Sequence, residues 1–166
     1  MRIAIETPLA QFTNDIADVV RLFFGEGAAV TVQDEHDAVL RHTHLMLDGV
    51  WTESFFLPGG QGDLSVSLSH AAVLDGGLEE KRQLKRLIKR TCYQLLKSYT
   101  GRQPAWGSLT GIRPTRLYYQ QMESGKDRAE ARAALADLFD LSEEKLDRSE
   151  ERRIGKECRS RWSPYH

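Results

Sequence analysis

The chain has 166 residues, of which 40% are hydrophobic and 28% charged, with a formal net charge of −1. This composition is typical of a soluble globular protein with a real core. No apolar run approaches the roughly 20 residues needed to cross a bilayer, and the N-terminus lacks the apolar stretch of a signal peptide, so we expect a cytoplasmic protein. Two distant cysteines, Cys92 and Cys158, make neither a disulfide framework nor a metal quartet.

Residues 1–77 predict an α+β domain, built from a small antiparallel sheet with one helix. Alternating or β-rich runs predict strands at 2–6, 28–33, 39–47, 50–57 and 64–69, and apolar residues at helical spacing predict one helix at 12–23. Asp48-Gly49 is a strong signal for a two-residue hairpin between the third and fourth of these strands. The strand-rich pattern favours a sheet with its helix on one face.

Residues 78–147 predict a helical segment of three to four helices. An apolar stripe from Leu84 to Tyr99, opposite a face of Lys and Arg, predicts an amphipathic helix of about six turns that ends at Gly101. A Gly-rich loop follows, and Pro114 suits the first position of a helix reaching about Met122. The next helix, 129–138, is preceded by Asp127 and Glu130 at capping-box spacing, and Ser142 resembles the cap of one more helix.

Charge is strongly segregated along the chain. Residues 1–80 carry 13 acidic and 3 basic side chains, whereas residues 81–119 carry ten Lys or Arg and no acidic residue. This basic block could dock against the acidic part of the same chain, or it could bind an external anionic partner. Nucleic acid is the less favoured partner, because no aromatic residue interleaves within residues 81–90 to stack on a base.

The segment after the long helix carries a family resemblance. Residues 104–116, PAWGSLTGIRPTR, resemble the P-W-G-x-L-T-G-I-R-P-T-K block of HemZ-type, oxygen-independent coproporphyrinogen III oxidase-like radical SAM proteins. The later residues 141–146, LSEEKL, are similar to that family's stretch just before its barrel. The resemblance covers about 60 residues within 84–147 closely, whereas residues 1–80 match only as a variable α+β region.

The resemblance implies that a radical SAM barrel follows this segment. In the family that barrel carries a C-x-x-x-C-x-x-C motif, whose thiolates hold a [4Fe–4S] cluster that binds S-adenosylmethionine. The implied reaction is the oxygen-independent oxidative decarboxylation of coproporphyrinogen III in porphyrin and haem biosynthesis. None of the motif cysteines stands in this sequence. We therefore expect an inactive, non-catalytic N-terminal domain without a cofactor or metal of its own, which has as partner the missing C-terminal radical SAM domain and meets the porphyrinogen only in the full-length protein.

Two roles remain open for the Gly-rich loop and the helix after it. A substrate- or anion-binding site would use Arg113, Arg116, Ser108 and Thr110, because guanidinium groups at a helix N-terminus suit the carboxylates of a porphyrinogen. Alternatively, Trp106, Gly107, Gly111 and Pro114 fix the loop against the missing barrel. A standalone anion- or nucleic-acid-binding module that uses the 81–119 block is the alternative function.

Two further expectations concern histidines and the C-terminal tail. His42 and His44 alternate on one strand with His36 nearby, a pattern that we interpret as a solvated edge strand and not as a metal site. Residues 148–166 closely resemble the translation of a common sequencing adapter, so we expect them to be non-native. The native part would then be 1–147, cut just inside a new helix; the alternative is a genuine basic, disordered tail.

Overall fold

The computed structural model describes residues 1–59, 62–109, 114–141 and 144–145. The chain divides into two compact units, Met1–Gln103 and Pro104–His166, and each is considered by itself. The tail predicted to be non-native, 148–166, lies outside the described residues. In the described part, no helix is long and apolar enough to cross a membrane.

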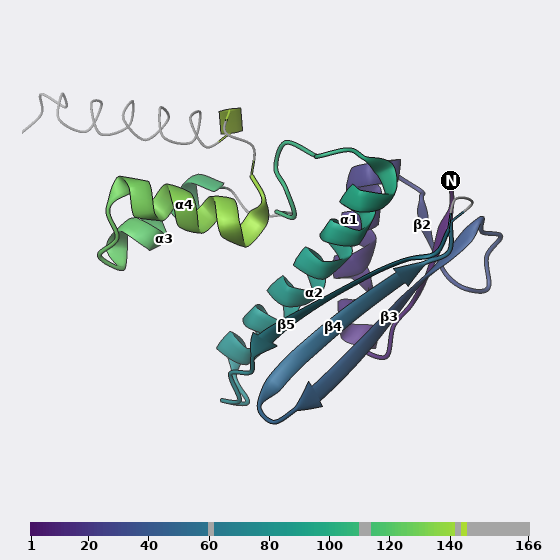
Figure 1. Cartoon of the computed structure of the whole chain (residues 1–166), viewed down its shortest axis with the longest axis horizontal. Helices are drawn as coiled ribbons and strands as arrows, with labels where there is room; N and C mark the ends of the chain where they lie inside the picture. Colours follow the sequence, from purple (N-terminus) through teal and green to yellow (C-terminus); the bar gives the residue numbers. More distant parts are fainter. Residues whose placement is uncertain (60–61, 110–113, 142–143, 146–166) are drawn as a thin grey trace, which may run out of the picture. The chain divides into compact units, whose positions relative to one another are not determined.

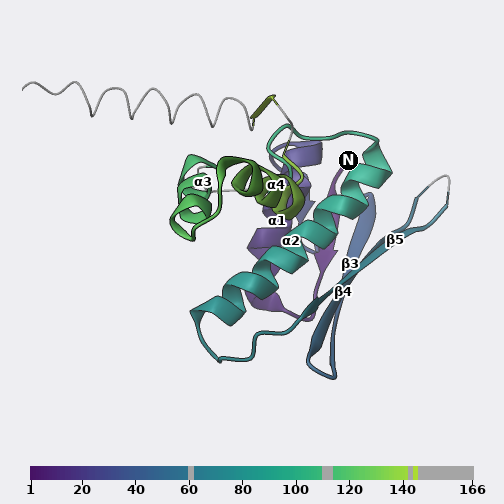
Figure 2. The same ribbon diagram turned by 60° about the vertical axis from the view of Figure 1, so that its left-hand side comes forward.

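The first unit is a five-stranded sheet with two long helices, which confirms the predicted α+β class. The strands are β1 Ile3–Glu6, β2 Ala29–Val30, β3 Ala38–Leu47, β4 Val50–Leu57 and β5 Leu64–Ala71, in the order β2-β1-β3-β4-β5. The helices are α1 Thr13–Phe24, preceded by a short 3-10 turn at Ala10–Phe12, and α2 Leu78–Thr100. Figures 1 and 2 show α1 and α2 together on one face of the sheet, with the other face open.

The sheet is mixed and not wholly antiparallel. β1 pairs in parallel with β2 and β3, whereas β3, β4 and β5 are antiparallel neighbours. The parallel pairing of β1 and β2 follows from the crossover through α1, which returns the chain to the same end of the sheet. The predicted hairpin at Asp48-Gly49 is confirmed, since both residues have positive φ angles, 50° and 72°.

The long helix α2 belongs to the core of the first unit. It packs against α1, β4 and β5, and its buried residues Ile88, Cys92 and Leu95 join those of the sheet and α1 in one cluster. The domain boundary expected after residue 77 therefore falls inside this unit. The predicted end of the helix is confirmed, because Gly101 caps it in a left-handed conformation.

In its described residues, the second unit packs two helices and a loop around a smaller core. The helices are α3 Pro114–Glu123 and α4 Arg128–Phe139, close to the predicted ranges. The capping box is confirmed: the Glu130 amide donates to the Asp127 side chain, and the Asp127 amide donates to that of Glu130. Its buried core residues are Leu109, Tyr118, Ala131, Leu135, Phe139 and Leu141. Because this core is small, the stability of the second unit depends strongly on each of its apolar contacts.

Candidate functional site

The loop that resembles the family block is held from within by the end of α4. The Ser108 amide donates a hydrogen bond of 2.8 Å to the Phe139 carbonyl, and the Leu109 amide donates one of 3.1 Å to Trp106. Leu109 itself is buried in the core of the second unit. The loop is thus anchored by its backbone and one apolar side chain.

Gly107 is required at the tightest point of this packing. Its φ is +55°, and a Cβ at this position would lie 1.7 Å from the Phe139 carbonyl oxygen and 2.6 Å from that of Asp140. These atoms belong to the backbone, so they cannot rotate away as a flexible side chain could. Any larger residue would push the loop off α4, which explains a glycine here.

The loop and α3 present two larger side chains to the surface. The ring of Trp106 is 39% exposed, and the Lys145 ammonium lies 5.0 Å from the centre of the ring, a cation–π contact. Arg116 is exposed on α3, while Tyr118 on the same helix is buried. An exposed indole and an exposed guanidinium are side chains in which protein interfaces are enriched.

The predicted anion-site residues are described only in part. Ser108 is buried, with its hydroxyl 3.5 Å from the Phe139 carbonyl oxygen. Thr110, Gly111 and Arg113 lie outside the described residues. Pro114 begins α3, as expected from its fixed φ. Arg116 is exposed on α3, and its role in anion binding stays a prediction.

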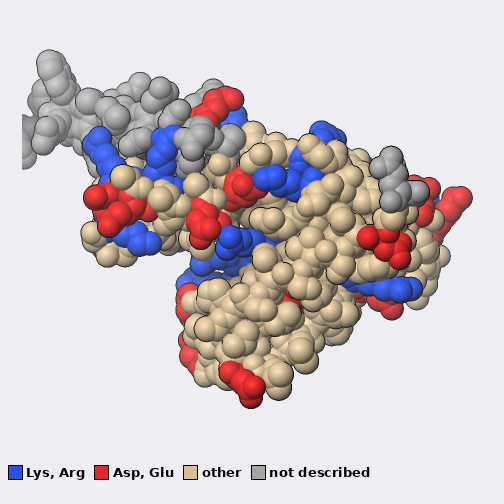
Figure 3. Space-filling view, in the orientation of Figure 1, with Lys and Arg blue, Asp and Glu red and all other residues tan. Residues whose placement is uncertain are grey.

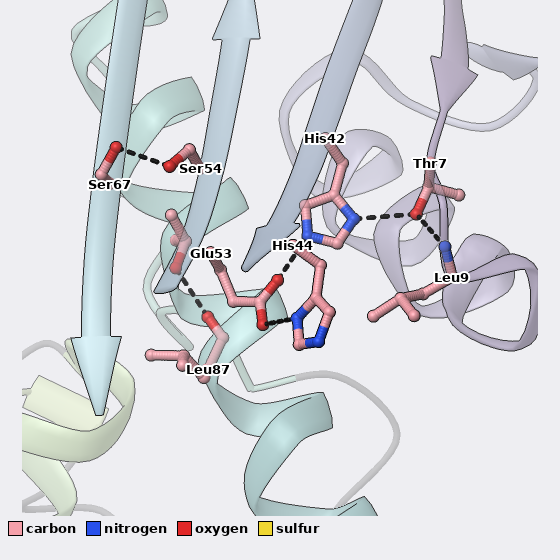
Figure 4. Close-up of polar contacts among 9 residues, drawn as sticks. Thr7, Leu9, His42, His44, Glu53, Ser54, Ser67 and Leu87 are labelled. Carbon is pink, nitrogen blue, oxygen red and sulfur yellow. Dashed lines mark hydrogen bonds and ion pairs between the residues drawn. The ribbon is translucent and has the colours of Figure 1, made fainter. Parts of the chain in front are cut away.

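A second polar cluster lies in the first unit, where sequence reasoning missed it. Glu53 on β4 is fully buried and accepts from two histidines of β3: His42 Nε2 is 2.7 Å from one carboxylate oxygen, and His44 Nδ1 is 2.6 Å from the other. Figure 4 shows the carboxylate between the two imidazole rings. On its far side, His42 Nδ1 is 2.8 Å from the Thr7 hydroxyl, which also accepts from the Leu9 amide.

The contacts of His42 fit one tautomer of its imidazole ring. If Nε2–H of His42 donates to Glu53, its Nδ1 accepts from Thr7, and every polar atom of the imidazole has a partner. The ring also stacks on Phe55 at 4.4 Å and 10°. His44 is more exposed, with 21% of its side chain accessible.

The solvated edge strand expected for His42 and His44 is wrong. β3 lies between β1 and β4, and both histidines point to the side of the sheet that the helices cover. The signal was present in the sequence, because Glu53 alternates with the apolar Trp51, Phe55 and Leu57 and therefore had to point inward. Within the described ranges, no group of three or more His, Cys, Asp or Glu is arranged to hold a metal ion.

The basic block is engaged in part by the chain's own acids. Lys85 on α2 forms a 2.5 Å ion pair with Asp15 on α1, and Arg82 lies 3.8 Å from Glu79. Lys89 is nearly buried, and this burial lowers the pKa of its ammonium, with Asp15 opposing the shift. These contacts support docking against the acidic part of the same chain and do not favour a standalone anion-binding module.

The cysteines do not fit an iron–sulfur cluster. Cys92 is fully buried in the core, and this desolvation raises the pKa of its thiol well above the usual range, so it stays protonated. Cys158 lies outside the described residues, and the sequence contains these two cysteines alone. A C-x-x-x-C-x-x-C site needs three thiolates that converge, which this chain does not supply.

Comparison with known proteins supports the family resemblance. Over 68 residues the chain is 37% identical to the oxygen-independent coproporphyrinogen-III oxidase-like protein HemZ of Bacillus subtilis (strain 168). The match covers 41% of this chain but 14% of that protein, so the chain spans about a seventh of its length. No family model matches the chain, and no solved structure matches it. The chain is related to this coproporphyrinogen oxidase-like protein over the matched segment.

Proposed function

We propose that the chain is the non-catalytic N-terminal region of an oxygen-independent coproporphyrinogen III oxidase-like radical SAM protein of porphyrin and haem biosynthesis. The observation that carries the proposal is the 37% identity over 68 residues to the HemZ protein. The catalytic [4Fe–4S] cluster and S-adenosylmethionine would be bound by another part of such a protein, because the cysteines of this chain do not fit them.

The second unit supports a docking role for its surface. The backbone of Gly107 and Ser108 packs against the end of α4, whereas the side chain of Trp106 is exposed. A rigid loop with an exposed indole loses little side-chain freedom when a second domain covers it. Arg116, on α3, would then contribute either to the interface or to the attraction of an anionic porphyrinogen toward it.

The full-length gene provides the first test. Intact genomic DNA should continue the reading frame beyond codon 147 into a sequence with C-x-x-x-C-x-x-C. A frame that ends soon after this point, or continues without the motif, would contradict the proposal.

The full-length protein provides the second test. Trp106→Ala and Arg116→Ala should each lower specific activity at least about tenfold if they lose roughly 1.4 kcal/mol of transition-state or interface stabilisation, with little change in Tm. Gln120→Ala is the matched control, because Gln120 is exposed on α3 one turn beyond Arg116. Equal activity of all three variants per folded molecule would make this surface structural.

The 166-residue chain alone provides the third test. After anaerobic reconstitution with iron and sulfide, it should bind neither iron nor S-adenosylmethionine, since Cys92 is buried and protonated. The appearance of visible cluster absorbance that is lost in Cys92→Ser would show that this chain holds a cluster after all.

A further inference from the structure

β5 forms a long, regular edge of the sheet in the first unit. All eight residues, Leu64–Ala71, pair in unbroken register with Leu57–Val50 of β4, and in the described part of the chain β5 has no other strand neighbour. The opposite edge differs, because β2 has two residues. One edge is therefore short and blunted, while the other presents a full row of backbone donors and acceptors.

The β5 edge lacks the usual devices that prevent strand addition. Its sequence, LSVSLSHA, contains no Pro, Lys, Arg, Asp or Glu, and its register shows no bulge. Native proteins protect long, flat edges with such features, so an unprotected edge indicates a pairing partner. Figure 3 shows that the open face of the sheet around β3, β4 and β5 is also largely free of charged side chains.

We propose that β5 pairs in antiparallel fashion with β5 of a second copy of this chain, about a twofold axis perpendicular to the sheet. Residues that face each other across an antiparallel pair point to the same side. A twofold axis through Ser67 places Ser65 opposite Ser69 and Val66 opposite Leu68. Hydroxyls then meet hydroxyls on the open face, and Val66 meets Leu68 on the helix face, where Leu64 meets His70 at each end of the pair.

The neighbouring strand pair already uses this hydroxyl pairing. Ser67 donates to Ser54 across β4 and β5 at 2.7 Å, and Thr52 lies 2.8 Å from Ser69. A second β5 would extend the same rows by one strand. Leu64, Val66 and Leu68 are now half-buried, and a partner strand would cover more of their apolar surface.

The chemistry of the edge favours a second copy over a charged peptide. Self-pairing sets no Asp, Glu, Lys or Arg of one β5 against another, and β5 offers no such charge with which to select an acidic or basic partner. An isologous dimer also uses one self-complementary surface, the commonest arrangement of oligomers. Because one strand pair buries less area than a standard interface, the dimer should be weak and concentration-dependent.

Sedimentation of the full 166-residue chain over a wide concentration range tests the proposal. The wild type should shift from monomer to dimer, and Ser67→Lys should remove the dimer, since the axis brings two lysines together. Thr43→Lys is the control: Thr43 lies in the same cross-strand row, two strands away from the edge. A wild type that stays monomeric at all concentrations would overturn the proposal, as would a dimer that survives Ser67→Lys or is lost equally in Thr43→Lys.

Disulfide trapping keeps the test decisive if Ser67→Lys fails to fold. In a Cys158→Ser background, with Cys92 buried, single cysteines at Ser65, Ser67 and Ser69 would be oxidised separately and in mixtures. Pairing about Ser67 predicts that Ser67→Cys links to itself and that Ser65→Cys links to Ser69→Cys. An axis moved by one residue gives Ser65→Cys linked to Ser67→Cys, or Ser67→Cys linked to Ser69→Cys. Absence of all these dimers would contradict edge pairing.

Discussion

The first unit encloses its polar cluster, whereas the second unit leaves its aromatic and basic side chains at the surface. Glu53 is 0% exposed and receives two imidazoles, all on the side of the sheet that the helices cover. Trp106 and Arg116 are exposed on a frame that is fixed by backbone contacts. The buried cluster is therefore expected to stabilise the first unit, whereas the exposed side chains of the second unit are available to contact another molecule or domain.

Glu53→Ala should give the largest change and would test the closed character of the first cluster. Removing the carboxylate leaves the buried His42 N–H and the partly exposed His44 N–H without their acceptor, a loss of about 2–4 kcal/mol in unfolding free energy. Urea unfolding followed by far-UV circular dichroism would measure it. Glu53→Gln keeps the shape and one acceptor oxygen, so its loss should be smaller, roughly 1–3 kcal/mol. Equal stability of wild type and Glu53→Ala would show that the cluster is solvated in solution.

Gly107→Ala should give the next largest change and would test how the second unit holds its loop. The added Cβ meets the Phe139 carbonyl oxygen, and a left-handed φ is strained for alanine, so a loss of roughly 2–4 kcal/mol is expected. Hydrogen exchange of the α4 amides would report it. Gly125→Ala is the control, since Gly125 also has a positive φ but no atom within 4 Å of the added Cβ. If both variants lose the same stability, backbone strain alone accounts for the effect.

Lys89→Met should give the smallest change and would test whether the basic face of α2 is partly internal. Burial lowers the pKa of Lys89, so the folded state binds this proton less tightly than the unfolded state does. The folding stability is therefore highest above the unfolded pKa of about 10.4 and decreases as pH falls through the folded pKa. At neutral pH the variant should be more stable by roughly 1 kcal/mol or less, and this advantage should shrink as pH rises. Lys85→Met, which removes the ion pair with Asp15, is the control and should not gain stability.

The sequence predicted local structure well where one signal decides it. The hairpin at Asp48-Gly49, the end of α2 at Gly101 and the capping box at Asp127 depend on neighbouring residues and were all confirmed. The parallel pairing of β1 was not predicted, because alternation gives the faces of a strand and not its direction. The attachment of α2 to the sheet was also missed, since an amphipathic stripe does not say which surface will cover it.

The candidate sites also differ in how much of them local sequence could predict. Trp106 and Gly107 were recognised from their place in a family block, yet the reason for the glycine appeared only with the Phe139 carbonyl beside it. Glu53 and its histidines depend on pairing between strands: His44 stands opposite Glu53 in the β3–β4 register. Thr7 joins them from the residue just after β1, 35 residues before His42, a distance that no local pattern spans.

The position of β1 between β2 and β3 governs the order in which the first unit can form. β1 is made first, but its partner β3 comes about 35 residues later, as the Arg2–Asp37 hydrogen bond shows. The β3–β4–β5 meander depends on nearer contacts and can nucleate earlier, since short loops close with a smaller loss of entropy. The first strand can therefore pair with β2 after α1 has formed but lacks its β3 partner until residues 38–41 have been made, so we expect its insertion between the two strands to be a late step of folding.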